Sequence, residues 1–333
     1  MTDRQKKHDV YGIGHALVDL QYSISLTALE ELGIEKGVMT MVDAAQQQEL
    51  VSALPEPVKS ASGGSAANTM IAIARFGGRP HYACLVGDDE LGGFYRRDLE
   101  QAGVGSAAAN SLPGRTGQCV VLVTPDADRT MATFLGASAS IGPSQLEPPI
   151  LQDSQYVYLE GYLVTSDAAL DACVAAQRLA REHGTSVSLT LSDPAIVEFF
   201  KDRFERLIES GVDLLFCNEE EARALTGAGD RAAACDAIAS LVPRACITCG
   251  PDGAVVIDGD TRSEIDGIDI EAVDTTGAGD AFAGGVLFGI TNGYGLAESA
   301  RLGCYAGSRV VSAYGPRLED SLNERVREII SAP

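Results

Sequence analysis

The hydrophobic pattern in the second half of the chain alternates between two kinds of segment. Short runs rich in Val, Ile and Leu predict strands at 156–159, 186–191, 213–217, 245–249 and 253–258. Longer segments with apolar residues at helical spacing predict helices at 166–183, 195–210, 219–226, 230–241, 279–291, 296–312 and 319–330. Such alternation is typical of a mainly parallel sheet that is covered by helices on both faces.

The first half of the chain adds segments that do not fit this alternation. Residues 10–14 and 79–86 predict buried strands, and 26–54 carries two helical patches. In contrast, 17–25 and 115–138 are rich in β-forming residues with no helix between their strands. We therefore expect one discontinuous α/β unit with a small β-sheet lid. The large part is expected at about 1–16, 44–114 and 139–333, and the lid at about 17–43 and 115–138.

Composition and charge narrow the class of protein. The chain has 47 acidic and 25 basic residues, and its formal charge of −22 argues against nucleic acid or an anionic membrane as a standing partner. The eight cysteines are scattered, mostly in apolar runs, which fits reduced thiols in the cytoplasm. Cys246 and Cys249 have CxxC spacing but no second pair, so zinc or redox chemistry is disfavoured. We expect a soluble, cytoplasmic protein, and composition does not choose between a monomer and a homodimer.

The segment Asp274-Thr-Thr-Gly-Ala-Gly-Asp280 carries the strongest chemical signal. Gly277, Ala278 and Gly279 are small enough to let backbone amides converge on an anion, and a helix N-terminus follows them. Asp280 could then take a proton from a hydroxyl that attacks a phosphoryl group while the amides hold the developing charge. An ordinary helix start capped by Gly-Asp explains the same residues.

Other polar groups follow predicted strands or open predicted helices. Asp19 interrupts an apolar strand, either as an edge residue or as a ligand for hydroxyls. Asn68 lies one turn into a helix that follows Gly63 and Gly64, where it either reaches a ligand or is an ordinary polar position. Because open α/β sheets bind ligands at the carboxyl ends of their strands, these groups favour one shared site.

Two further strand ends strengthen that expectation. Asn218 and Glu221 follow strand 213–217, and Thr248 opens a glycine turn after strand 245–249. Each feature alone resembles a common cap or turn. The chain has no G-x-x-x-x-G-K-[ST] loop, so phosphate charge must be met by amides, a helix dipole and Mg²⁺.

These residues together resemble the ribokinase-like carbohydrate kinase family (phosphofructokinase-B type) over essentially the whole chain. One signature region runs from 63–68 (GGSAAN) through 87–92 (GDDELG), and the second is the 274–280 segment followed by Ala-Phe. The pattern is most similar to bacterial adenosine kinase-type members in the segments 16–19, 63–68, 133–137, 160–162 and 191–194. His15 departs from that branch, which often has Asn there.

The resemblance implies an ATP- and Mg²⁺-dependent kinase that phosphorylates a primary hydroxyl of a ribose-bearing substrate, with adenosine as the first candidate. Asp280 would be the base, and Gly277, Ala278 and Gly279 would form the anion hole. Substrate contacts would come from Asp19, Gly63, Gly64, Asn68 and Glu160. Nucleotide contacts would come from Asn218, Thr248, Gly250 and Gly253. Metal contacts would come from Glu221, indirectly to Mg²⁺, and from Asp274 and Thr276 to a monovalent cation such as K⁺.

Three alternatives remain open from the residues. Phe134, in the predicted hairpin, is either an aromatic wall for a purine or sugar or a core residue. The acceptor is either a nucleoside or a free sugar, such as ribose, fructose or a 2-keto-3-deoxy sugar. A catalytically silent ligand-binding relative is disfavoured, because it would have no need of Asp280 beside the glycines.

Overall fold

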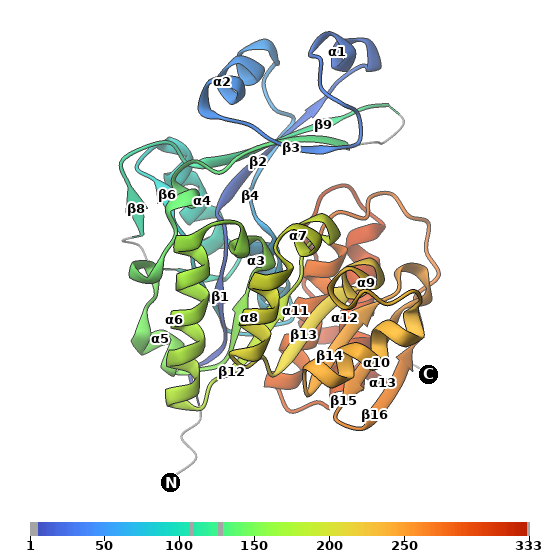
Figure 1. Cartoon of the computed structure of the whole chain (residues 1–333). Helices are drawn as coiled ribbons and strands as arrows, with labels where there is room; N and C mark the ends of the chain where they lie inside the picture. The colour runs from blue at the N-terminus through green and yellow to red at the C-terminus, as the bar shows by residue number, and fades with distance from the viewer. Residues whose placement is uncertain (1–5, 107–109, 126–128, 332–333) are drawn as a thin grey trace.

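The larger of two main sheets organises the fold (Figure 1). The structure is a computed structural model, and it describes residues 6–106, 110–125 and 129–331. The nine strands of the larger sheet are, in spatial order, β16 (Thr261–Ile265), β15 (Ala254–Asp258), β14 (Arg244–Thr248), β13 (Leu214–Asn218), β12 (Ser186–Thr190), β11 (Ser154–Leu159), β1 (His8–Ile13), β5 (Pro80–Ala83) and β7 (Gly105–Ser106). Strands β14 to β7 pair in parallel, and only the pairings of β15 are antiparallel. The predicted fold class is therefore confirmed.

Two hydrophobic cores cover the two faces of this sheet. One face is covered by α3 (Ser65–Arg75), α4 (Glu90–Gln101), α11 (Ala278–Thr291), α12 (Leu296–Val311) and α13 (Val326–Ser331). The other face is covered by α5 (Pro148–Gln152), α6 (Asp167–His183), α7 (Pro194–Phe199), α8 (Lys201–Glu209), α9 (Glu219–Thr226) and α10 (Arg231–Leu241). Burial on both faces explains why the strands are almost continuously apolar.

Helix α11 packs closely between α3 and α12 because its interior positions are small. A Cβ atom at Gly284 would lie 2.5 Å from the Cβ of Ala72 in α3. A Cβ atom at Gly285 would lie 2.7 Å from the backbone nitrogen of Gly303 in α12. The small-residue run at the start of α11 therefore fixes the depth and angle at which Asp280 enters the site.

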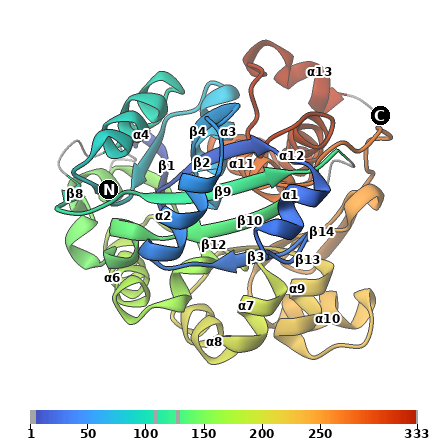
Figure 2. The same cartoon turned by 90° about the horizontal axis from the view of Figure 1, so that it is seen from above.

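A smaller five-stranded sheet lies across the carboxyl ends of the larger sheet's strands (Figures 1 and 2). Its strands are, in order, β3 (Met39–Met41), β10 (Arg129–Phe134), β9 (Gly117–Val123), β2 (Leu17–Ser23) and β4 (Lys59–Gly63). Two short helices, α1 (Leu26–Glu31) and α2 (Ala44–Ala53), lie above it in Figure 1. A separate ribbon pairs β6 (Val86–Gly87) with β8 (Ser111–Leu112).

The smaller sheet includes segments that the sequence did not assign to it. β4 joins its edge by antiparallel pairing with β2, although the sequence placed those residues in the large part. Helix α2 also attaches to it, since Gln47 donates a buried hydrogen bond to Gln118 of β9. Alternation alone could not assign β4, because its Lys-Ser-Ala-Ser-Gly sequence has almost no apolar residues.

Two helices and one strand also differ from the sequence prediction. The helix predicted at 195–210 is two helices, because the backbone at Phe200 leaves helical values. The helix predicted at 319–330 is reduced to a 3₁₀ turn (Asn323–Arg325) and α13. Strand β16 was not expected, because it is a mostly exposed edge strand with charged residues. The turn predicted at 125–128 falls mainly outside the described residues.

All eight cysteines are free thiols, and only Cys304 is not buried. Burial raises the pKa of most of them, so they remain protonated and unreactive. In the part of the chain that the structure describes, no helix has the length and apolar character needed to cross a bilayer.

Candidate active site

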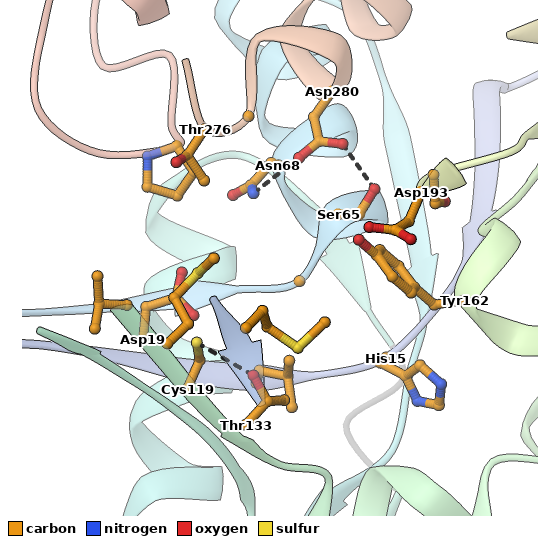
Figure 3. Close-up of a pocket in the computed structure, with 18 of the residues that line it drawn as sticks. His15, Asp19, Ser65, Asn68, Cys119, Thr133, Tyr162, Asp193, Thr276 and Asp280 are labelled. Atoms are coloured by element: carbon orange, nitrogen blue, oxygen red, sulfur yellow. Dashed lines mark hydrogen bonds between the residues drawn. The ribbon is translucent and has the colours of Figure 1, made fainter. Parts of the chain in front are cut away.

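A cavity of about 520 Å³ lies between the smaller sheet and the carboxyl ends of the larger sheet's strands. Figure 3 shows side chains around it from the smaller sheet (Asp19, Cys119 and Thr133), from α3 (Ser65 and Asn68) and from α11 (Asp280). Most of the predicted site residues line it: Asp19, Gly64, Asn68, Glu160, Asn218, Glu221, Thr276, Gly277, Gly279 and Asp280. The fold therefore brings together residues from across the chain, as expected from the polar strand ends.

Asp280 lies in the first turn of α11, and its carboxylate faces α3. Ser65 Oγ donates a hydrogen bond of 2.7 Å to Oδ1, and Asn68 Nδ2 donates one of 3.1 Å to Oδ2. Burial raises the pKa of Asp280 to about 6, and these two hydrogen bonds partly offset that effect. Such a carboxylate is ionised at neutral pH and is a stronger proton acceptor than an ordinary Asp.

The turn before Asp280 requires glycine at its first position. Gly277 has a φ of +76°, and a Cβ atom there would lie 2.2 Å from the carbonyl oxygen of Pro316. The Ala278 amide donates to the carbonyl of Thr275, and the Ala281 amide donates to that of Gly277. In contrast, the amides of Gly279 and Asp280 have no backbone partner among the described residues. Those amides at the positive end of the helix dipole can hold an anion beside Asp280.

Asp19 enters the cavity from β2, on the side opposite Asp280 (Figure 3). It lies directly under Gly63, where a Cβ atom would approach its carboxylate to 2.2 Å. Burial raises the pKa of Asp19 to about 7, although Arg317 and Arg129 favour the charged form. Asn68 Oδ1 is also buried and has no partner in the described part of the chain. These two groups offer acceptors for substrate hydroxyls.

Glu160 lies beneath the cavity, where its two oxygens hold backbone groups. Oε1 accepts from the His15 amide at 3.2 Å, and Oε2 accepts from the Ala66 amide at 2.8 Å. Burial raises the pKa of Glu160 to about 8 and lowers that of His15 to about 4. His15 is therefore neutral, and its Nδ1 lies 3.0 Å from Ser138 Oγ.

Asn218 and Glu221 form a reciprocal cap at the start of α9. The Glu221 amide donates to Asn218 Oδ1 at 2.8 Å, and the Asn218 amide donates to Glu221 Oε2 at 2.9 Å. Both side chains also line the cavity, so the cap and the site use the same residues. Thr248 pairs with Asn218 across β13 and β14, which places the turn holding Gly250 and Gly253 next to this corner.

The remaining predicted residues lie outside the cavity lining. Gly63, Ala278 and Asp274 lie within two residues of lining residues along the chain. Phe134 is half-buried under the guanidinium of Arg115, 5.4 Å from the ring centre, and does not line the cavity. Its contact with a substrate stays a prediction.

The sequence agrees with this geometry. Residues 37–322 match the profile of the pfkB family carbohydrate kinases. The chain belongs to that family. It is therefore a carbohydrate or nucleoside kinase.

Two solved structures are similar to this kinase over nearly its whole length. An adenosine kinase from Sinorhizobium meliloti is 38% identical with a TM-score of 0.89, covering 97% of this chain and 99% of that one. A probable sugar kinase from Rhizobium etli is 36% identical with a TM-score of 0.90, covering 97% and 98%. The adenosine kinase of Saccharomyces cerevisiae is 28% identical, over 91% of this chain and 95% of its own.

Several lining residues of the kinase were not identified from its sequence. Ser65 could have been found, because it directly follows the glycine pair that opens α3. Asp193 also follows a strand, like the other polar strand ends. Arg129 and Arg317 carry no local signal, since an isolated arginine in a hairpin or a C-terminal loop resembles a surface residue. Only the fold brings them to the cavity.

The raised pKa values predict an acidic limit to activity. As the expected base, Asp280, with a pKa of about 6, must be ionised to take a proton, and protonation of Asp19, with a pKa of about 7, turns one of its acceptor oxygens into a donor. Because protonation begins as the pH falls through 7, kcat/KM should decline below about pH 7 rather than near pH 4. A pH–rate profile of kcat/KM checks this. A constant value down to pH 5 would contradict it.

Proposed function

We propose that this kinase transfers the γ-phosphoryl group of ATP to the 5′-hydroxyl of a nucleoside, with adenosine as the principal substrate. The proposal is supported by the similarity of the chain to the adenosine kinases of Sinorhizobium meliloti and Saccharomyces cerevisiae. It is supported above all by the wall of the cavity that the smaller sheet provides.

Around Asp19, which itself belongs to β2, that wall is more apolar than polar, although Gln21, Lys59, Arg129 and Thr133 also line it. Four of its strands contribute Leu17, Met39, Met41, Val121 and Met131, and Leu135 follows β10. A free sugar has hydroxyls around its whole ring, and those facing this wall would lose hydrogen bonds with water without replacement. A purine has two apolar faces that pack favourably against methionine and branched side chains. The wall therefore favours a substrate that joins a ribose to a flat base.

Separate residues of the chain would bind the ribose, accept the proton and stabilise the transferred charge. Asp19 and Asn68 would hold ribose hydroxyls, so that the primary hydroxyl lies beside Asp280. Asp280 would take the proton of that hydroxyl as the oxygen attacks phosphorus. The amides after Gly277 would hold the charge that develops on the transferred group. The smaller sheet would act as a lid that excludes water and so limits hydrolysis of ATP.

The surroundings of Glu221 fit a Mg²⁺ ion held chiefly by ATP. Within the described ranges, no group of three or more His, Cys, Asp or Glu side chains is placed to bind a metal by itself. Mg²⁺ commonly keeps its waters and substrate phosphates with one or two protein carboxylates. Bound there, it would neutralise phosphate charge, and Glu221 would orient its waters. The eight free thiols fit our expectation that the kinase acts in the cytoplasm.

A coupled ADP-release assay tests the proposed function. Adenosine, guanosine, ribose, fructose and a 2-keto-3-deoxy sugar are compared at equal ATP and Mg²⁺. We expect kcat/KM for adenosine to exceed that for ribose by at least about 10²-fold, because the sugar alone leaves the apolar wall unfilled. Higher turnover of a free sugar would instead support the sugar kinase alternative. Binding of adenosine without ADP release would support a catalytically silent relative.

A further inference from the structure

An ion pair joins the smaller sheet to the loop of the anion hole. Nη2 of Arg129, at the start of β10, lies 2.6 Å from Oδ2 of Asp274. The two side chains are only 9% and 4% exposed. Arg129 also lines the cavity, whereas Asp274 begins the segment that leads to Gly277 and Asp280. The pair thus connects the two walls of the site.

The Asp274 carboxylate is engaged at both oxygens. Oδ1 accepts from the Thr276 amide at 3.1 Å, and Oδ2 accepts from the Gly315 amide at 2.9 Å in addition to its pairing with Arg129. The Gly315 contact matters for the anion hole, because the next residue, Pro316, is the one whose carbonyl packs against Gly277. Asp274 therefore holds the segment on which the turn at Gly277 rests.

These contacts do not fit the monovalent cation implied by the family resemblance. A cation at Asp274 would share the carboxylate with a guanidinium that is already 2.6 Å away and carries the same charge. Two cations in contact with one carboxylate repel each other, and burial strengthens the repulsion. The positive charge that Asp274 needs is present in the chain itself.

We propose that Arg129 is a positioning residue that takes the place of a monovalent cation on Asp274. The proposal rests on the proposed function, because it assigns a role within the same site. Arg129 neutralises Asp274 when the smaller sheet lies over the cavity, and the carboxylate then holds the Gly315–Pro316 segment against Gly277. The anion hole is consequently organised by the sheet that covers the substrate and needs no K⁺.

The first test measures the salt dependence of the unaltered kinase. ADP release with adenosine is followed in KCl and in choline chloride at equal ionic strength. We expect kcat/KM to differ less than about 2-fold between the two salts. Thermal unfolding of the ligand-free protein is measured in the same salts, and we expect no K⁺-specific rise in Tm. Activation by K⁺ of more than about 10-fold, or a K⁺-specific Tm rise, would overturn the proposal.

The second test separates positioning from direct contact with the substrate. Arg129→Ala should lower kcat by about 30-fold, because it leaves a buried carboxylate without its partner. Asp274→Asn in the Arg129→Ala background should restore about 10-fold, because the uncompensated charge is removed. If the double variant is no faster than Arg129→Ala, Arg129 acts on something other than Asp274, and the proposal is wrong.

Control measurements distinguish these outcomes from a nonspecific effect of mutation, from misfolding and from failure of the proposed function. Arg262→Ala breaks an exposed ion pair with Asp236 and should leave kcat unchanged, since such pairs contribute little. If adenosine is not a substrate, the proposed function fails, but the comparison of Tm in the two salts still decides whether Asp274 binds K⁺. Tm of each variant also shows whether it folds.

Discussion

Replacing Asp280 with Asn is expected to lower kcat by about 10²- to 10⁴-fold, the range typical of a positioned general base. An amide cannot take the proton of the attacking hydroxyl, although it preserves the shape of the side chain and can still accept from Ser65. Adenosine affinity should change only a few-fold, because Asp19 and Asn68 remain in place. Single-turnover kinetics measure the chemical step, and calorimetry measures the dissociation constant.

The matched control for this variant is Asp236→Asn, which makes the same chemical change at an exposed ion pair. It should leave both kcat and Tm close to those of the unaltered kinase. Near-normal turnover of Asp280→Asn would mean that Asp280 only caps α11. That result would remove the proton transfer from the mechanism.

Replacing Gly277 with Ala should lower kcat by about 10²- to 10³-fold, comparable to the loss of an oxyanion-hole donor. The new Cβ would lie 2.2 Å from the Pro316 carbonyl, and the φ of +76° is unfavourable for alanine by about 1–2 kcal/mol. The turn must therefore shift and carry the amides of α11 away from the transferred group. The KM for adenosine should change much less than kcat, because Asp19, one of the two expected ribose contacts, lies on the other side of the cavity.

Gly229→Ala is the control for this variant. A Cβ atom at Gly229 would meet no atom within 4 Å, so kcat should be unaffected. Circular dichroism and Tm distinguish a local change at Gly277 from unfolding. If Gly277→Ala retains most of its kcat while folded, the amides that follow Gly277 do not stabilise the transferred charge.

The sequence predicted secondary structure best where burial alone determines the local pattern of apolar residues. Short apolar runs that alternate with segments of helical period predicted the larger sheet and its helices, because strands buried on both faces are apolar along their whole length. They did not predict β4 or β16, whose polar sequences owe their strand conformation to pairing with β2 and β15. Strands of that kind are stabilised by their neighbours and leave no local signal.

The same distinction holds within the site. Glycine pairs and polar strand ends were recognisable, because tight turns and helix starts require particular residues. Asn218 and Glu221 show that one motif can cap a helix and also lie in a site, since they cap α9 and line the cavity. Arg129 and Arg317 could not be found, because their partners Asp274 and Asp98 are distant in sequence.

The packing of α11 has a consequence for how the kinase loses activity. This helix is buried along almost its whole length, and its glycines contact α3 and α12 too closely for it to slide or rotate alone. Its amide hydrogens should therefore exchange with solvent only when the whole molecule unfolds. The smaller sheet has partly exposed strands at both edges and can open locally at much lower cost. Asp280 would thus keep its place throughout the movements that admit substrate and release product.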